Sequence, residues 1–291
     1  MLEIRHLTKR FLGRAVVDDV SFTVNPGEVL GYIGPNGSGK STTVKMIVGL
    51  LERHHGQVLY CGRDVRDDLA AFHSILGYVP EEPFVYPFLA GREYLQLAGR
   101  LRGLPERLLT EKMDALLDLF ALYEHRHSPI ASYSKGMKQK ILIVAALLHN
   151  PQVLIFDEPL SGLDVTTALV FKNLLHALKS RNKMILYSSH VLEVVERVCT
   201  RVLILRGGKV AGYDTVPALR AQCGSHSLEE VFTQIVEPRD TFAIAAQICL
   251  SQRAAEIARE VCRVPGETHP LPQEPSRPLP RRLHNRALIS G

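Results

Sequence analysis

The nine residues GPNGSGKST, Gly34 to Thr42, set the architecture of this chain. They match the pattern G-x-x-x-x-G-K-[ST], whose glycines allow the backbone to approach a phosphate group closely. The apolar run Val29–Ile33 before them predicts a buried strand, and the pattern of Ser41–Leu51 after them predicts a helix. N–H groups at a helix N-terminus stabilise a bound anion. We therefore predict a nucleoside triphosphate site here, in preference to an accidental glycine-rich turn.

The individual positions of this loop have distinct expected roles. Lys40 should lie over the β- and γ-phosphates, and the Ser41 hydroxyl should ligate Mg²⁺. The other residues expected to contact the nucleotide are Gly34, Pro35, Asn36, Gly37, Ser38, Gly39 and Thr42. The loop predicts a triphosphate ligand and leaves the kind of protein open.

A second apolar run, Val153–Phe156, ends in the carboxylates Asp157 and Glu158. In a parallel sheet, the carboxyl ends of the strands face the ligand crevice. We expect Asp157 to belong to the Mg²⁺ shell through water, and Glu158 to polarise the attacking water as a general base. The alternative is that the two acids cap the following helix.

Four shorter motifs follow a fixed order along the chain. They are YVPE at Tyr78–Glu81, YSKGMKQK at Tyr133–Lys140, SGLD at Ser161–Asp164 and SSH at Ser188–His190. With the phosphate loop and the carboxylate pair, this order resembles the ATP-binding cassette of ABC transporters, over about residues 2–236. The resemblance implies an α/β fold, in which a P-loop NTPase core with a mostly parallel sheet carries an antiparallel β subdomain and an inserted helical subdomain at about residues 82–150.

The resemblance also implies ATP and Mg²⁺ as cofactors and assigns a role to each motif. Glu81 is expected at the catalytic and metal site, His190 at the γ-phosphate and Asp164 beside the nucleotide. Two cassettes, identical or different, are expected to enclose two ATP molecules head to tail. Ser134 and Gly136 of one subunit would then face the γ-phosphate held by the other, where a second helix N-terminus adds N–H donors.

Three positions depart from the family pattern. Glu81 replaces the usual Gln, which predicts a working lid loop with an altered dependence on the metal ion. Lys135 and Met137 replace a Gly and a Gln of the signature, whose serine and second glycine remain, so activity should persist. The family places at Phe11 an aromatic ring that stacks on adenine, and packing in the core is the alternative role.

Periodicity predicts the remaining elements. Glu3–Leu7 and Val17–Val24 alternate apolar and polar residues, as half-buried antiparallel strands do, with Phe11 in the turn between them. Gly91–Ser132 has an amphipathic helical pattern. From Pro151 onward strands and helices alternate, which favours a parallel sheet covered by helices on both faces.

The loop Glu82–Tyr94 is rich in aromatic residues and proline. An exposed apolar patch often marks a site for a partner, so this loop is the expected contact with membrane subunits. The alternative is that its rings pack beneath the helical subdomain.

Composition limits the classes of partner. The net charge is +5, and residues 263–291, with five Arg and two Glu, account for three of these charges, so we expect no nucleic-acid partner. The five cysteines form no metal-binding pattern. The sequence lacks both an apolar run of about 18 residues and a signal peptide. We therefore expect a separate membrane permease, with this chain cytoplasmic and peripheral on the inner face of the cell membrane.

The C-terminal part is expected to differ from the cassette. Ser227–Phe232 resembles the last helix of drug- or polysaccharide-export cassettes, residues 237–262 are expected to form a helical extension, and residues 263–291 form a Pro/Arg-rich, disordered tail. The predicted function is ATP hydrolysis that powers transport, in the export direction, through the permease. The alternative is a soluble regulatory ATPase with no role in transport.

Overall fold

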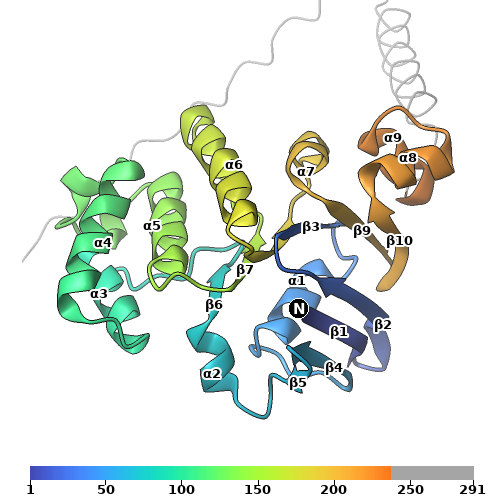
Figure 1. The fold of residues 1–291 in the computed structure, drawn as a ribbon, viewed down its shortest axis with the longest axis horizontal. Coiled ribbons are helices and arrows are strands. Elements are labelled where there is room, and N and C mark those ends of the chain that lie inside the picture. Colours follow the sequence, from blue (N-terminus) through green and yellow to red (C-terminus); the bar gives the residue numbers. More distant parts are fainter. Residues whose placement is uncertain (237–291) are drawn as a thin grey trace, which may run out of the picture. The chain divides into compact units, whose positions relative to one another are not determined.

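The computed structural model describes residues 1–236, and Figure 1 shows their arrangement. The helix predicted within residues 237–262 and the Pro/Arg-rich tail lie outside the described residues. None of the helices between residues 1 and 236 has both the length and the apolar content that crossing a membrane requires.

The centre of the structure is a six-stranded sheet in the order β10-β9-β3-β8-β7-β6. All neighbouring strands are parallel except β9 and β10, which pair antiparallel as a hairpin. These strands are β3 (Glu28–Ile33), β6 (Leu76–Val79), β7 (Val153–Asp157), β8 (Met184–Ser188), β9 (Arg201–Arg206) and β10 (Lys209–Thr215). Because helices and a second sheet cover its two faces, strands such as β7 and β8 are buried along their whole length.

One face of the central sheet packs against α1 (Lys40–Ile47) and a second, antiparallel sheet. The second sheet has the order β2-β1-β4-β5. Its strands are β1 (Leu2–Phe11), β2 (Arg14–Val24), β4 (His55–Tyr60) and β5 (Arg63–Asp64), and the short helix α2 (Leu69–Ser74) leads from it back to β6. The core between the two sheets therefore includes the inner face of α1, which fixes the helix that follows the phosphate loop.

Helices cover the opposite face of the central sheet (Figure 1). Phe171 of α6 packs edge-on against Phe156 of β7, with ring centroids 5.0 Å apart. The α-helices of this layer are α3 (Gly91–Leu101), α4 (Glu106–Leu119), α5 (Lys135–Leu147), α6 (Val165–Ser180), α7 (Leu192–Val198), α8 (Val216–Cys223) and α9 (Leu228–Val236). Two 3₁₀ turns, η1 (Tyr123–His125) and η2 (Ile130–Ser132), lie between α4 and α5. The α/β fold with a parallel core, an antiparallel sheet and helices inserted between β6 and β7 confirms the predicted fold class.

The guanidinium group of Arg201 is one of the polar links between the two sheets. Arg201 at the start of β9 forms an ion pair with Glu28 of β3 (Nε to Oε1, 2.5 Å) and donates a hydrogen bond to the carbonyl of Thr23 in β2 (3.0 Å). It also lies over the ring of Tyr213 in β10, 4.8 Å from its centroid. The antiparallel sheet is thus attached to the central sheet by a charged contact as well as by the apolar core.

Two predicted details are wrong. The helix after the phosphate loop ends at Ile47 and not at Leu51, because the chain turns at Gly49, which has a positive φ of 78°. Phe11 is the last residue of β1 and does not lie in the turn. Its side chain is 44 % exposed, so it is not packed in the core.

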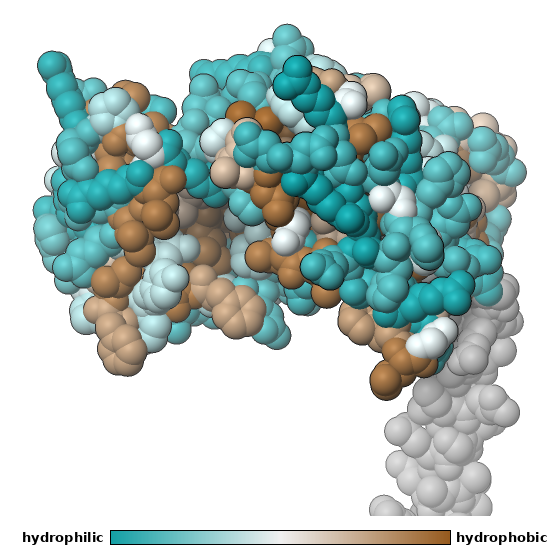
Figure 2. All heavy atoms as spheres, turned by 90° about the horizontal axis from the view of Figure 1, so that it is seen from below, coloured by the Kyte–Doolittle hydropathy of each residue, from teal (hydrophilic) through white to brown (hydrophobic). Residues whose placement is uncertain are grey.

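The aromatic loop between β6 and α3 is on the surface. Phe84 is 80 % exposed and Phe88 is 92 % exposed, so the alternative that these rings pack beneath the helices is wrong. Figure 2 shows brown side chains in groups on a face that is otherwise mostly teal, one group lying on the side where α3 and α4 appear in Figure 1.

Candidate functional site

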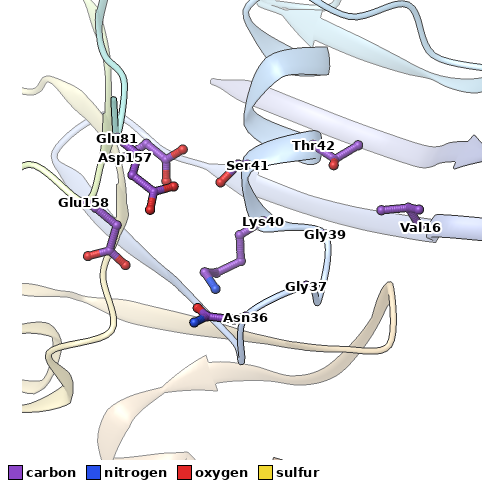
Figure 3. A pocket seen from close by; sticks show the side chains of 10 residues that line it. All are labelled: Val16, Asn36, Gly37, Gly39, Lys40, Ser41, Thr42, Glu81, Asp157 and Glu158. Carbon is purple, nitrogen blue, oxygen red and sulfur yellow. The ribbon is translucent and has the colours of Figure 1, made fainter. Parts of the chain in front are cut away.

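The phosphate loop borders a pocket of about 290 Å³. Figure 3 shows the ten residues that line it, which come from the loop, from the start of α1, from β2 and from the ends of β6 and β7. They are Val16, Asn36, Gly37, Gly39, Lys40, Ser41, Thr42, Glu81, Asp157 and Glu158. The fold thus brings the loop, Glu81 of the lid loop and both carboxylates to one place, as the topology of a parallel sheet requires.

Gly39 shows why the loop needs glycine. Its φ is 104°, outside the range that L side chains readily adopt, and a Cβ built there would lie 2.5 Å from the carbonyl oxygen of Val16. The loop backbone therefore packs directly against β2 and turns into α1, whose first N–H groups are exposed to the pocket. This is the geometry in which a helix N-terminus binds an anion.

Lys40 is folded back over the loop. Its Nζ donates hydrogen bonds to the carbonyls of Gly34 (2.7 Å) and Pro35 (3.1 Å). Burial lowers the pKa of Lys40, and the negative charges of Glu158, Asp157 and Glu81 oppose that shift. In Figure 3 the ammonium group points toward Asn36, with Glu158 on the other side of the pocket. The lysine is therefore the cation of a pocket that otherwise carries three carboxylates.

Asp157 is the most deeply buried of these carboxylates, with 2 % of its surface exposed. Burial raises its pKa, and the neighbouring charge of Glu81 raises it further, while the hydroxyls of Ser188 and Ser41 and the charge of Lys40 act in the opposite direction. Among residues 1–236, its Oδ1 atom has no hydrogen-bond partner. An unpaired buried carboxylate oxygen is costly unless something binds it.

The group around Asp157 fits a magnesium ion. Figure 3 shows the carboxylates of Glu81 and Asp157 side by side, with the Ser41 hydroxyl close to them. Hard oxygen donors of this kind are the ligands that Mg²⁺ prefers, and Mg²⁺ is usually held by one or two carboxylates plus substrate phosphates. The donor set is therefore suited to a metal ion that arrives with a nucleotide.

Glu158 is held differently from Asp157. It has a positive φ of 49°, unusual for a residue other than glycine, and its N–H donates to the carbonyl of Ser188 (3.0 Å). Burial raises the pKa of its carboxyl group. His190 opposes this shift, because its Nδ1 lies 2.8 Å from Glu158 Oε2. The structure thus brings Glu158 and His190 into contact, and the alternative in which the acids cap the next helix is wrong, because Asp164 caps α6.

Ser134 and Gly136 lie at the start of α5, outside the pocket. The Ser134 hydroxyl accepts a hydrogen bond from the N–H of Met137 (3.2 Å) and so caps the helix. A Cβ on Gly136 would lie 2.5 Å from the carbonyl oxygen of Gly162, which shows that the YSKGM turn and the SGLD loop pack directly together. The stem of Lys135 lies against the same Gly162.

Asp164 is also outside the pocket. Its carboxylate accepts hydrogen bonds from the backbone N–H of Thr167 (2.8 Å) and from the Thr167 hydroxyl (2.7 Å), and it forms an ion pair with Lys140 (3.2 Å). The Thr167 hydrogen bonds are the main cause that lowers the pKa of Asp164, and Lys140 adds to the effect. Within one chain, Asp164 therefore connects α6 to α5.

Some residues differ from the expected set. Val16 lines the pocket although no motif contains it, because it reaches the loop from the other sheet and no spacing in the sequence predicts such a contact. Gly34 and Pro35 line a neighbouring cavity instead, and Ser38 is buried. Phe11 does not line the pocket, and Lys9 Nζ lies 5.3 Å from the centroid of its ring.

Fold and pocket together define a nucleotide-binding cassette, and comparison with known proteins identifies its family. The chain belongs to the ABC transporter family, whose model matches residues 17–161. It is 38 % identical to the uncharacterised ABC transporter ATP-binding protein YhcH of Bacillus subtilis, over 74 % of this chain and 70 % of that protein. The linearmycin resistance ATP-binding protein LnrL of the same organism is 32 % identical, over 78 % of this chain and 73 % of that one.

A solved structure supports the same assignment. The ATP-binding subunit of an ABC transporter matches with a TM-score of 0.77 and 36 % identity, over 81 % of this chain and 99 % of that one. This chain is therefore an ABC ATP-binding subunit. Domains of this family bind ATP, typically with Mg²⁺, have ATPase activity, dimerise and pair with membrane permeases.

Proposed function

We propose that this chain binds and hydrolyses ATP with Mg²⁺ and uses the cycle to move a substrate through a separate membrane permease, in the export direction. The observation that carries the proposal is the pocket itself, in which one lysine and a helix N-terminus face three carboxylates. The lysine and the helix N-terminus suit a triphosphate. The carboxylates suit the metal ion that accompanies the triphosphate and the water that attacks its γ-phosphate.

The chemistry follows from the contacts. Lys40 and the N–H groups of α1 would bind the phosphates, and Ser41, Asp157 and Glu81 would hold Mg²⁺, whose charge would offset that of the phosphates. Glu158 polarises the attacking water. Its raised pKa suits a general base, because a more basic carboxylate accepts a proton more readily. His190 orients Glu158 and contacts the γ-phosphate.

The site needs a second cassette. Ser134, Gly136 and Asp164 lie outside the Lys40 pocket, at exposed ends of helices. In a head-to-tail pair, the N-terminus of α5 from one subunit would complete the γ-phosphate site of the other. Tighter binding of ATP to the closed pair is then what drives the permease, since a ligand shifts an equilibrium only by its differential affinity. Moving a population from 1:99 to 99:1 takes about 5.5 kcal/mol.

We place the permease contact at residues 82–94, which run from the loop after β6 into the first turn of α3. Phe84, Tyr86 and Phe88 are exposed there, and exposed aromatic side chains are enriched at the centres of protein interfaces. This loop directly follows Glu81, so movement at the metal site reaches the permease through a few residues of backbone. Bound to the permease, the chain would lie in the cytoplasm as a peripheral subunit on the inner face of the membrane.

The export direction is inferred from sequence similarity to export cassettes. The SLEEVF segment resembles the last helix of export cassettes, and the relative LnrL carries resistance to linearmycin in its name. Cells that overproduce the chain with its permease should therefore lose a preloaded substrate faster when ATP is present. ATP-dependent accumulation in the cells would instead indicate import.

The proposal is tested by isolating the membrane protein that co-purifies with this chain and reconstituting both in liposomes. ATP hydrolysis should accelerate when the two are together, and Phe84→Ala with Phe88→Ala should remove that acceleration while leaving nucleotide affinity unchanged. Leu50→Ala, at another exposed apolar residue, is the matched control. A chain that hydrolyses ATP but captures no membrane protein under any nucleotide condition would contradict the transport role and favour a regulatory ATPase.

A further inference from the structure

The SLEEVF segment forms the start of α9, and α9 is docked onto α7, the helix that follows His190. The side chain of Glu196 in α7 accepts a hydrogen bond from the N–H of Leu228, the first residue of α9 (3.2 Å). The same carboxylate forms an ion pair with Arg220 of α8 (3.2 Å). Leu228 and Val231 are buried in the core beneath α9. The position of α9 is therefore fixed relative to α7.

A second cavity, of about 420 Å³, lies beside the nucleotide pocket. It shares Asn36 with that pocket, and Pro35 also borders it from the phosphate loop. Ser189 and His190 border it from the loop after β8, Leu192 from α7 and Phe232 from α9. The cavity is thus the place where α9 approaches the residues of the nucleotide site.

Few contacts hold the side chain of His190 in place. Its side chain is 73 % exposed, and its hydrogen bond within the described residues is the one to Glu158. In the loop around it, the Ser189 hydroxyl accepts a hydrogen bond from the N–H of Val191 (3.1 Å). Leu192, the first residue of α7, borders the same cavity as the half-buried ring of Phe232. An exposed imidazole with one side-chain hydrogen bond among the described residues depends on the position of its loop to meet Glu158 in one geometry.

We propose that Phe232 is a positioning residue for ATP hydrolysis: its ring, held by α9, supports the loop 189–192 and so keeps His190 in contact with Glu158. The inference rests on the proposed roles of His190 and Glu158. Phe232 acts through His190 and does not touch the nucleotide pocket. Truncating the ring would enlarge the cavity and allow the loop to sink into it, away from Glu158.

The test uses the full chain and four forms of it: wild type, Phe232→Ala, Phe232→Leu and Val231→Ala. Val231 is the neighbouring residue of α9, buried in the core but not lining the cavity. Its truncation therefore loosens α9 without removing the ring that borders the cavity. We expect Phe232→Ala to lower kcat about 10- to 100-fold, since a displacement of about 1 Å costs that much, with KM for ATP nearly unchanged. Phe232→Leu should restore most of the rate.

A spectroscopic readout accompanies the kinetics. The ¹⁵N signals of the His190 ring report its tautomer and its hydrogen bond to Glu158, and they should change in Phe232→Ala and remain as in wild type in Val231→Ala. Unchanged ring signals in Phe232→Ala, or an equal loss of kcat in Val231→Ala, would overturn the inference. If wild type itself hydrolyses no ATP, the proposed function fails, and the ring signals alone still decide whether Phe232 positions His190.

Discussion

Glu158 and His190 form the contact that matters most at the residue scale. The two groups come from the ends of adjacent strands, β7 and β8, and the backbone of Glu158 is itself tied to Ser188. Burial raises the pKa of Glu158 and His190 lowers it, so the base strength of the carboxylate is a balance between the two. Removing His190 should therefore change the acidity of Glu158 as well as remove the proposed contact with the nucleotide.

His190→Ala should lower kcat about 10²- to 10³-fold, the usual cost of removing one donor from a charged transition state. In the acid limb of the pH profile, kcat falls because the base is protonated, and for the remaining activity this limb should lie at a higher pH than in wild type. The contact that lowers the pKa of Glu158 is gone, so Glu158 is protonated earlier as pH falls. A pH profile of kcat measures this, with surface His226→Ala as control. An acid limb at the wild-type pH would show that His190 does not act on Glu158.

Glu81→Gln tests the metal site. The substitution removes one of two adjacent carboxylates, so the Mg²⁺ concentration for half-maximal ATPase activity should rise about tenfold, in the range found when groups around a metal are altered. It should also lower the pKa of Asp157, because the charge of Glu81 is one of the causes that raise it. Mg²⁺ titrations of the ATPase rate give the first value. Identical titration curves for the two proteins would remove Glu81 from the site.

The sequence predicted which residues meet at the pocket where a motif has a fixed spacing. GPNGSGKST and the acids at the end of β7 lie together as expected, and their roles toward phosphate, metal and water stay predictions. The opposite holds for Val16, Phe232 and the pairing of Gly136 with Gly162, because these contacts join segments far apart in sequence. The sequence does not encode such distances locally, so only the folded chain reveals them.

At the scale of elements, the inserted helices are attached to the sheet at one edge. Arg102 at the end of α3 donates to the carbonyls of Leu76 (2.8 Å) and His73, and His149, after α5, hydrogen-bonds to the same Leu76 carbonyl (3.0 Å). Burial lowers the pKa of His149 to about 4, and the charges of Arg102, Lys112 and Lys183 add to the effect, against the hydrogen bond to Leu76. The folded chain therefore favours a neutral imidazole at this position.

His149→Gln should make stability less dependent on pH. A histidine with an ordinary pKa of 6.5 when unfolded and about 4 when folded binds more protons in the unfolded state between these values. Stability is therefore intact above pH 6.5 and is lost as pH falls toward 4. We expect the wild-type Tm to decrease more than that of His149→Gln between pH 7 and pH 5, measured by calorimetry. Parallel decreases in both proteins would contradict the linkage.

Elements with strong periodicity were predicted closely, and short ones were not. The helix α6 falls within the alternation of strands and helices predicted from Pro151 onward, because a long apolar stripe leaves little choice. The strands β4 and β5 and the helices α2 and α8 escaped prediction, since each is eight residues or shorter and depends on packing against neighbours. The role of the residues that line the site stays a prediction for direct biochemical tests.

At the scale of the whole molecule, the proposed function gives each chain two half-sites. The phosphate loop and the carboxylates would form one, and the helix ends at Ser134 and Asp164 would form the other. Ser134 and Asp164 lie outside the Lys40 pocket of their own chain, so we propose that a complete site requires a second copy or a related cassette.

Glu158→Gln, which leaves the pocket in place but removes the base, should trap the paired state. With saturating ATP and Mg²⁺ we expect a mass of two chains in light scattering, and one chain without nucleotide, since ATP then binds both halves without being consumed. Lys40→Ala with Glu158→Gln should remain monomeric under both conditions. A single-chain mass for Glu158→Gln at saturating ATP, alone and with its permease, would contradict the paired site.

The guanidinium that joins Glu28, Thr23 and Tyr213 has a mechanical consequence for ligand choice. The hairpin of β1 and β2 carries Phe11 and Val16, and this clasp holds it at a set separation from the strands that carry the acids. If the base stacks on Phe11, as the family resemblance implies, this attachment limits the distance available between the base and the terminal phosphate. Arg201→Lys, which keeps the charge but not the fork of donors, should then loosen the hairpin and widen the range of nucleotides that the site accepts.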